Sequence, residues 1–344
     1  MRLGILTFHH GFNYGGFLQV YALQEYLTSL GCDVQVINYA NRRHLRRKMR
    51  NIMRLNHPLR FLKEVKRMMV FVKAHRTYLD CTERLRSCSD ISKLGFDAVV
   101  LGSDEIWNFN NMMFGYDPCY FGTGFKAGRI IAYAASFGPR NLHERPPEQV
   151  SLALSCLDAI SVRDYNSQVF VNRLTGRDAP LVADPTFLVD FEEKLPARQP
   201  GPYAILYGGD LEPRVFTKIR AYTRAHRLKL IALGYPHPGC DMTLESMTPF
   251  QFLGWLKNAR IVFTGMFHGS VFSILYRRPF VFWMNAYRKN KVDHMFKRIG
   301  IHRVVSTEDE FDCIVNQEID YETVFSEIGN YINESKEYIQ NAIF

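Results

Sequence analysis

The sequence predicts an α/β protein with two Rossmann-like parallel-sheet domains that face each other across a cleft. Strand-like apolar runs alternate with helical patterns along most of the 344 residues. A chain of this length suffices for two domains at roughly 100–200 residues each. The charged segment 192–202 holds three prolines and is the best linker candidate. We therefore expect one domain at residues 1–195 and a second at 196–320.

The first domain begins with a strand–helix–strand unit, which predicts a parallel pair of strands. The glycine-containing turn 12–16 joins a strand at 3–8 to an amphipathic helix at 17–31, and a strand follows at 33–39. Further strands are expected at 97–102, 129–138 and 159–162. Asp164 is a plausible N-cap for a helix at 165–176.

The second domain repeats the alternation. Strands are expected at 203–209, 229–235, 260–265 and 279–283, and helices at 213–227, after His268 and at 290–300. Thr248 and Pro249 form a typical helix start. Residues 321–344 read as a final helix that could pack back on the first domain.

Composition excludes several classes of protein. With 47% hydrophobic and 22% charged residues, the chain resembles an ordinary globular protein. We expect no secretory leader, because a strand-like run comes directly at the start of the sequence, and no apolar run reaches the ~18–20 residues that a membrane span needs. The seven cysteines show no metal-binding spacing, so we expect free thiols, no metal site and a cytoplasmic location.

The net charge of +9 is concentrated in one place. Residues 41–77 contain thirteen lysines and arginines but a single acid, Glu64, with apolar residues interleaved at helical spacing. This basic helical insertion, at about 41–90, could pack on the core through its apolar stripe or lie on the inner face of an anionic membrane. Nucleic acid is not expected as a partner, because no nucleic-acid-binding motif accompanies the charge.

Several expected strands end in small and polar residues, and ligands bind at such strand ends in open α/β sheets. The candidates for binding an acceptor or lining the cleft are Asn13, Tyr14, Gly15, Ser103, Trp107, Asn108 and Gly208. The amides of the 13–16 turn could bind an anion or a hydroxyl, and Trp107 could stack on a sugar ring. A tight turn and a core tryptophan are the structural alternatives.

Three side chains could carry chemistry. Asp104 could take a proton from a hydroxyl, and Arg163 could bind a carboxylate or phosphate unless it pairs with Asp164 or Asp184. His268 follows the strand 260–265, with Gly269 and a helix cap at Ser270 behind it, which suits acid–base chemistry beside an anion. For His9 and His10, at the end of the first strand, a structural role is favoured. No GxGxxG motif is present, so a nicotinamide cofactor is not expected, and no Walker lysine pattern is present either.

Blocks of residues along the chain resemble the bacterial polysaccharide pyruvyltransferase family. The blocks are LTFHHGFNYGGFLQVYALQEYL, FDAVVLGSDEIWN, ISVRDYNS, VADPTFLV and TPFQFLGWLKNARIVFTGMFHGSVFSILYRRPFVF, in this order. The resemblance reaches from the first strand to about Ile301. It implies a GT-B-like fold and transfer of a pyruvyl group from phosphoenolpyruvate to two hydroxyls of a sugar. The product would be a cyclic ketal on a polysaccharide or its lipid-linked precursor, with phosphate released. Arg163 would bind the donor and His268 would be the catalytic acid or base.

One position departs from the family pattern. Many members have an arginine two residues before the histidine, and here Met266 stands there. A thioether cannot bind phosphate, so we expect the cation to come from Arg288, Lys289 or Lys291. The departure leaves two alternatives open: a GT-B-type glycosyltransferase that uses a nucleotide sugar, and a noncatalytic glycan-binding relative.

Overall fold

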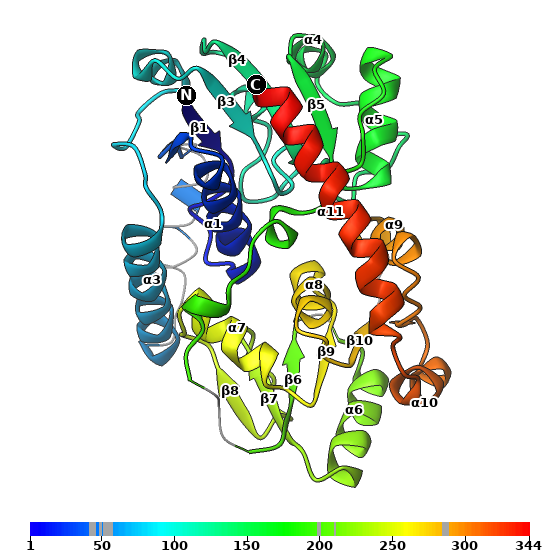
Figure 1. Ribbon diagram of the computed structural model, residues 1–344. Coiled ribbons are helices and arrows are strands. Elements are labelled where there is room, and N and C mark those ends of the chain that lie inside the picture. The colour runs from blue at the N-terminus through cyan, green and yellow to red at the C-terminus, as the bar shows by residue number, and fades with distance from the viewer. Residues whose placement is uncertain (41–45, 48–49, 51–57, 198–200, 210, 284–288) are drawn as a thin grey trace. The chain divides into compact units, whose positions relative to one another are not determined.

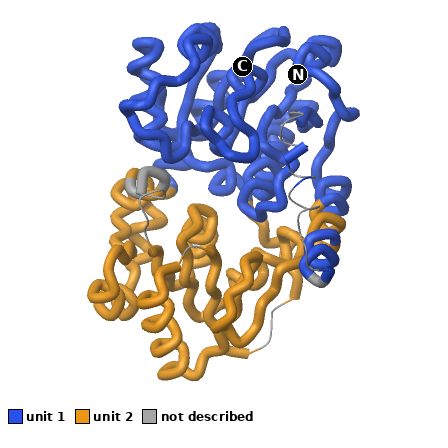
Figure 2. The backbone as a smooth tube through the Cα atoms, turned by 180° about the vertical axis from the view of Figure 1, so that it is seen from behind, with its two compact units in different colours: residues 1–65, 72–189, 329–344 blue, residues 66–71, 190–328 orange. Residues whose placement is uncertain are grey.

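The computed structural model describes residues 1–40, 46–47, 50, 58–197, 201–209, 211–283 and 289–344. The chain forms two compact units, coloured separately in Figure 2. Unit 1 comprises residues 1–65, 72–189 and 329–344, and unit 2 comprises residues 66–71 and 190–328. Each unit contains one parallel sheet, which confirms the predicted fold class of two parallel-sheet α/β domains. The cleft between them stays a prediction.

The sheet of unit 1 has five parallel strands (Figure 1). Apolar side chains form one cluster on each of its faces. Alternate residues of a strand point to opposite faces. Val99 and Leu101 accordingly join one cluster, whereas Ala98 and Val100 join the other. The strands lie in the order β2 (Asp33–Val36), β1 (Arg2–Leu6), β3 (Ala98–Leu101), β4 (Arg129–Ala135) and β5 (Ala159–Val162). The helices are α1 (Tyr14–Ser29), α3 (Pro58–Tyr78), α4 (Gln149–Ser155) and α5 (Tyr165–Thr175), with short 3₁₀ segments η1 (Cys88–Leu94), η2 (Pro118–Phe121) and η3 (Pro185–Phe187).

The sheet of unit 2 is also wholly parallel. Its order is β11 (Val304–Val305), β10 (Phe280–Trp283), β9 (Ile261–Thr264), β6 (Tyr203–Tyr207), β7 (Lys229–Leu233) and β8 (Met242–Leu244). Its helices are α6 (Pro213–Ala225), α7 (Pro249–Lys257), α8 (Phe267–Leu275), α9 (Lys289–Arg298) and α10 (Glu308–Asn316), with the 3₁₀ segment η4 (Glu192–Lys194) before β6. The edge strands β8 and β11 were not expected, because two or three residues are too few to show a periodic pattern.

Each sheet has one point at which the strand order reverses. In unit 1 the chain runs outward from β1 to β2 and then from β3 to β5, so the reversal lies between β1 and β3. In unit 2 it lies between β6 and β9. Ligands of open α/β sheets bind beyond the carboxyl ends of the strands at such a switch point. The residues that follow these four strands are therefore the first candidates for a site.

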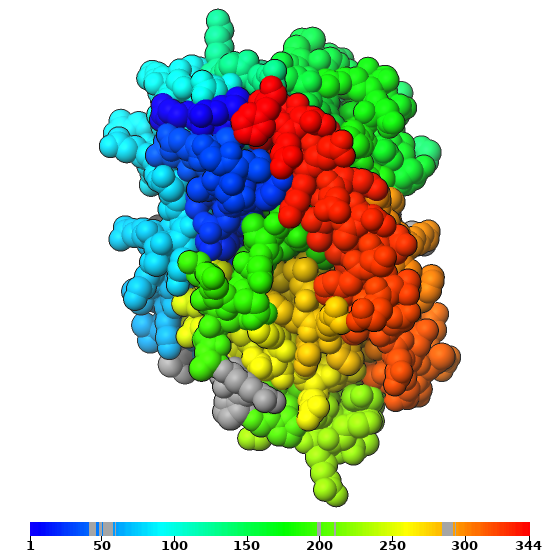
Figure 3. Space-filling view, viewed as in Figure 1, coloured from blue at the N-terminus to red at the C-terminus, as the bar shows by residue number. Residues whose placement is uncertain are grey.

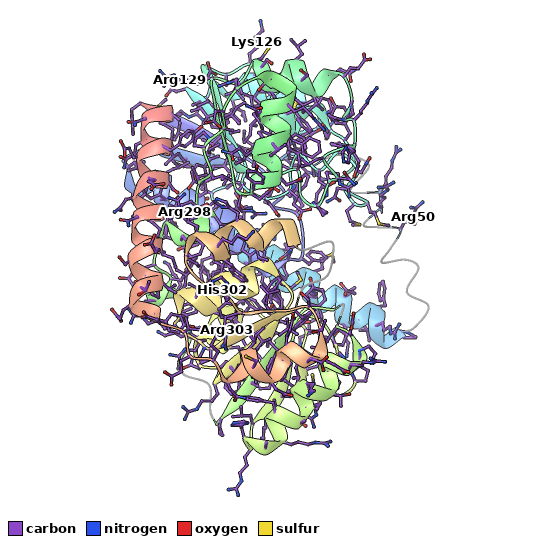
Figure 4. The ribbon with its side chains drawn as sticks, turned by 90° about the vertical axis from the view of Figure 1, so that its right-hand side faces the viewer. Arg50, Lys126, Arg129, Arg298, His302 and Arg303 are labelled. Carbon is purple, nitrogen blue, oxygen red and sulfur yellow. A yellow bond between two sulfur atoms is a disulfide. The ribbon has the colours of Figure 1, made fainter. Side chains whose placement is uncertain are left out.

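The helix α11 (Tyr321–Ile343) closes the chain and contributes to the surface (red in Figures 1 and 3). Its residues up to Ile328 belong to unit 2 and those from Gly329 onward to unit 1. In unit 1 its last turn is fixed by Arg129, which donates to the carbonyls of Ala342 and Ile343 at 3.1 and 3.2 Å (Figure 4). A cation is favourable at this negative end of a helix.

The expectation of seven free thiols is wrong for two of them. Cys88 of η1 and Cys119 of η2 form a disulfide. They are 31 residues apart in sequence, but the fold brings their Cα atoms to 5.7 Å. Sequence spacing alone does not reveal such a pair, because the proximity arises from the packing of two irregular segments.

Among the described helices, none combines the length and apolar character that crossing a membrane requires.

Candidate functional site

In unit 1, hydrogen bonds join the residues that follow β1 and β3. The hydroxyl of Thr7 donates to the carbonyl of Ser103 at 2.8 Å. The Ser103 hydroxyl accepts from the amide of Asp104 at 2.6 Å and lies 3.4 Å from Asp184 Oδ2. Thr7 and Ser103 are fully buried, so these bonds fix the strand ends rather than face solvent. Ser103 therefore positions Asp104 instead of binding a ligand itself.

Arg163, which follows β5, is paired with two carboxylates. Its Nη1 lies 2.6 Å from Asp184 Oδ2, and its Nη2 lies 3.5 Å from Asp104 Oδ1. Burial disfavours the charged guanidinium, but Asp184 and Asp104 outweigh this and hold the pKa of Arg163 above its ordinary value. The Asp184 side chain is fully buried, whereas that of Asp104 is 23% exposed. Asp184 is thus the fixed partner and Asp104 the partner that a ligand could replace.

The turn before α1 does not provide the free amides that were expected. Asn13 is the N-cap of α1, and its Oδ1 accepts from the amides of Gly15 and Gly16 at 3.0 and 3.3 Å. The side chain of Tyr14 is buried. Asn13 has the residue type that prefers an N-cap, and the local cap satisfies the amides that a ligand would need. Residues 13–16 are therefore the tight turn that was the structural alternative to a ligand-binding turn.

Trp107 and Asn108 are also core residues, so the expectation that Trp107 offers a flat face to a sugar is wrong. The indole of Trp107 is fully buried, packs near Phe121 and Phe137, and donates to the carbonyl of Tyr120 at 3.0 Å. Asn108 is buried and donates to Glu105 Oε2 at 3.1 Å. Aromatic neighbours distant in sequence cover the indole, and the local sequence could not show this.

In unit 2, the switch point is built around Thr264. Its hydroxyl donates to the carbonyl of Tyr207 at 2.8 Å and accepts from the amide of Met266 at 3.0 Å. The ends of β6 and β9 are therefore joined directly. Gly208 has φ +138°, and a Cβ there would lie 3.0 Å from Trp283, so glycine is required by conformation and by space. The role of Gly208 in binding a ligand stays a prediction.

His268 lies in the first turn of α8, immediately beyond β9. The expected helix start at Ser270 is wrong: α8 begins at Phe267 with Met266 as N-cap, and the Ser270 hydroxyl donates to the carbonyl of Phe267 at 2.7 Å. The Met266 side chain supplies no cap hydrogen bond. The imidazole is 8% exposed, with the Phe267 ring 5.1 Å and the Phe272 ring 6.2 Å away. A histidine at the positive end of a helix and at a switch point is well placed for acid–base chemistry on an anion.

The cations expected to replace the missing arginine are only partly described. Arg288 lies outside the described residues, and so do the side chains of Lys289 and Lys291 in α9. Arg303 is a buried cation of unit 2 that sequence reasoning missed (Figure 4). It donates to the carbonyls of Phe280, Ile314 and Gln317. Arg303 therefore fixes β10 and the end of α10 and serves the structure.

Thr7 was not singled out from the sequence, and Asp184 appeared there only as a possible ion-pair partner of Arg163. Asp184 precedes a proline, and such a residue is disfavoured in helices and often starts a turn. That signal marks a turn but does not indicate that its carboxylate reaches Arg163. Thr7 carried no signal, because a threonine at a strand end is common.

Comparisons with known proteins agree on family and fold. A family model described as polysaccharide pyruvyl transferase matches residues 13–285. A comparison with curated protein sequences gives no match. Among solved structures, a putative UDP-N-acetylglucosamine 2-epimerase from Listeria monocytogenes is 10% identical, with a TM-score of 0.57 and coverage of 99% of this chain and 95% of that chain. The UDP-GlcNAc 2-epimerase of Neisseria meningitidis, bound to UDP-GlcNAc, is 11% identical, with a TM-score of 0.55 and coverage of 100% and 99%. UGT89C1 of Arabidopsis thaliana, complexed with UDP-L-rhamnose, is 11% identical, with a TM-score of 0.50 and coverage of 99% and 98%. At these identities the likeness shows the fold alone, which is that of GT-B enzymes.

Proposed function

Because this chain belongs to the polysaccharide pyruvyl transferase family and is a transferase, we propose that it moves a pyruvyl group from phosphoenolpyruvate to two hydroxyls of one sugar. The product is a cyclic ketal on a cell-surface polysaccharide, such as a capsule or exopolysaccharide, or on its lipid-linked precursor. The observation that carries the proposal is His268 in the first turn of α8, at the switch point of the second sheet. Phosphoenolpyruvate needs no further cofactor in this scheme.

The reaction balances with one acid and one base. His268 gives a proton to the methylene carbon of phosphoenolpyruvate, and the carbon that bears the ester oxygen becomes electron-poor. A first sugar hydroxyl adds there, and a second displaces phosphate and closes the ketal. Of the two hydroxyl protons, one replaces the proton that His268 gave, and the other leaves with the phosphate. Asp104 is proposed to accept one of them.

Arg163 is proposed to bind the carboxylate or phosphate of the donor. Its bond to Asp184 at 2.6 Å would hold the guanidinium in place, while the longer contact to Asp104 at 3.5 Å would be exchanged for the donor. Donor binding would then free the Asp104 carboxylate from its contact with Arg163, so that it can accept a hydrogen bond from a sugar hydroxyl. Arg288, Lys291, Gly269 and Ser270 are the other donor-binding candidates. Of these, Gly269 and Ser270 are buried, so only their backbone could contribute.

We also propose that α3 holds the enzyme on the inner face of an anionic membrane, near a lipid-linked acceptor. Phe61, Leu62, Met69 and Val72 are 42%, 60%, 57% and 41% exposed on this helix. Exposed cations accompany them: Arg60, Lys63, Lys66, Lys73 and Arg76. An apolar surface flanked by basic residues is typical of helices that lie on anionic lipid.

Incubation with phosphoenolpyruvate and a panel of lipid-linked and aryl glycosides tests the proposed reaction. We expect phosphate release that depends on the glycoside, and a product with the mass of the pyruvyl ketal. His268→Ala should abolish both while the circular dichroism spectrum is unchanged, since the imidazole is the proposed acid. Full activity of His268→Ala would remove this residue from the mechanism.

A nucleotide-sugar transferase is the second candidate, because two of the similar solved structures contain UDP-sugars. Binding of UDP-GlcNAc to the protein, with no binding of phosphoenolpyruvate, would favour this candidate. Met266→Arg distinguishes a noncatalytic relative: activity that appears only in this variant would show that the native chain has lost its donor site.

A further inference from the structure

Unit 1 contains a cavity of about 420 Å³ that the proposed chemistry does not use. It is lined by His9, His10 and Phe12 after β1, by Asn38 after β2, and by His75 near the end of α3. The cavity therefore opens at the carboxyl edge of the sheet, where ligands of α/β proteins bind. Its volume lies in the range of pockets that hold small molecules.

The histidines of this cavity are held in place by backbone contacts and by contacts between rings. The amide of His9 donates to the carbonyl of Thr7 at 3.0 Å, and the His9 ring lies 3.2 Å from the same carbonyl through Nδ1. The His10 ring packs 3.9 Å from the His9 ring. His75 Nε2 contacts the carbonyl of His9, and its ring meets Phe17 edge to face at 5.2 Å. Three imidazoles from two elements are thus fixed around one space.

The charges around the cavity favour a neutral ligand over an anion. The cavity is lined by one cation, Arg76, and by one carboxylate, Asp80, so their formal charges cancel. Burial raises the pKa of Cys81 to about 11, so its thiol is uncharged at neutral pH. Imidazoles can both donate and accept hydrogen bonds, as sugar hydroxyls do. Phe12 and Leu79 add apolar walls that suit the C–H face of a sugar ring.

Asn38 adds an acceptor that the protein leaves unused. Both backbone groups of Asn38 are hydrogen-bonded: its amide donates to Thr82 Oγ1 at 3.0 Å, and its carbonyl accepts from the amide of Leu85 at 3.0 Å. Its Oδ1 is buried and has no hydrogen-bond partner among the described residues. The amide can turn about its last side-chain bond, and a ligand hydroxyl would then satisfy it.

We infer that this cavity binds one neutral sugar residue of the acceptor through the imidazoles, Asn38 and the Phe12 wall. Its role as the acceptor subsite rests on the proposed pyruvyl transfer, whereas sugar binding itself does not. A hydrogen-bonded path links the cavity to the proposed base, because Thr7 bonds both His9 and the carbonyl of Ser103, beside Asp104. The apolar and basic surface of α3 continues into the cavity through Val72 and Arg76, which suits a sugar on a lipid carrier.

Saturation-transfer NMR on the full chain tests the inference, with methyl glycosides of glucose, galactose, mannose and N-acetylglucosamine as probes and no donor present. We expect at least one glycoside to bind. Phe12→Ala and His75→Leu should each weaken it by about tenfold or more, because a buried polar or stacking contact is lost. His143→Leu, at an exposed histidine of the same unit, is the matched control and should leave binding unchanged.

Asn38→Leu, with the melting temperature as a check on folding, is the second variant, because it keeps the volume and removes the acceptor. No binding of any glycoside to the native chain, or equal binding by the cavity variants and the control, would overturn the inference. Inorganic phosphate that displaces the glycoside at this cavity would also overturn it, since it would show an anion site. Glycoside binding without pyruvyl transfer would leave the sugar site standing and remove the proposed reaction.

Discussion

Gly269 lies in the first turn of α8, where the helix passes close to the ends of β6 and β9. A Cβ at this position would overlap the side chain of Thr264 and lie 2.9 Å from Tyr207 Cδ1. Thr264 cannot move away without breaking its bonds to Tyr207 and Met266. Gly269 is therefore a packing residue that sets the position of its neighbour, His268.

Gly269→Ala should destabilise unit 2 by about 1–3 kcal/mol, because overpacking forces a buried neighbour to shift. Hydrogen exchange of the β6 and β9 amides measures the loss of stability in unit 2 separately from unit 1. Gly329→Ala in α11 is the control: a Cβ there meets nothing within 4 Å, and the helix should gain about 0.5–1 kcal/mol. Unchanged exchange in Gly269→Ala would contradict the packing role.

Residue types at strand ends could be predicted from the sequence, but not their surroundings. Trp107 and His268 both follow a strand among small and polar residues, yet one is a core residue and the other is at the switch point. The difference arises from Phe121 and Phe137, which cover the indole and are distant from it in the chain. Arg163 shows the same limit, since its pairing with Asp104 joins two strand ends 59 residues apart.

At the scale of elements, strands of four or more buried residues could be predicted, because they form continuous apolar runs. The start of α8 could not, because Ser270 has the residue type of a cap and Met266 does not. The amide of Met266 donates to the hydroxyl of Thr264, two residues earlier, and that hydroxyl is fixed in turn by its bond to the carbonyl of Tyr207, 57 residues away. The helix is longer by one turn than its local sequence indicates, and this places His268 inside it.

The helix α3 carries the prediction about the membrane. Replacing Lys63, Lys66 and Lys73 by glutamate should weaken co-sedimentation with phosphatidylglycerol liposomes at low salt by about a hundredfold or more, since each cation contributes ~1 kcal/mol near an anionic surface. These side chains are exposed, so the fold should tolerate the changes. Raising the ionic strength should reduce binding of the native chain in the same way.

The control for α3 replaces Arg224, Lys229 and Arg260, exposed cations of unit 2, by glutamate. The net charge changes equally, so equal loss of binding would show that total charge rather than α3 attracts the membrane. Binding to single-stranded nucleic acid at the same salt, with none to liposomes, would contradict the membrane role altogether.

At the scale of the whole molecule, the chain crosses from unit 1 to unit 2 and returns through α11. The sequence indicates a final helix that could pack back on the first domain, but not the contacts that hold its second half there. Two of them are polar: Ser335 Oγ accepts from the amide of Ala183 at 2.8 Å, and Gln340 lies 3.1 Å from the Tyr26 hydroxyl. Ile339 and Ile343 then complete the apolar cluster beneath β1 and β3.

Ile339→Ala should therefore destabilise unit 1 by about 2–5 kcal/mol, although the residue lies at the opposite end of the sequence from β1. Hydrogen exchange of the β1 and β3 amides should rise, while that of β6 and β9 should stay the same, because Ile339 belongs to the cluster of unit 1 alone. Asn333→Ala, on the exposed side of α11, is the matched control and should change neither. Equal loss of protection in both units would show that the chain unfolds as a single cooperative body, so that α11 stabilises the molecule as a whole rather than the sheet on which it packs.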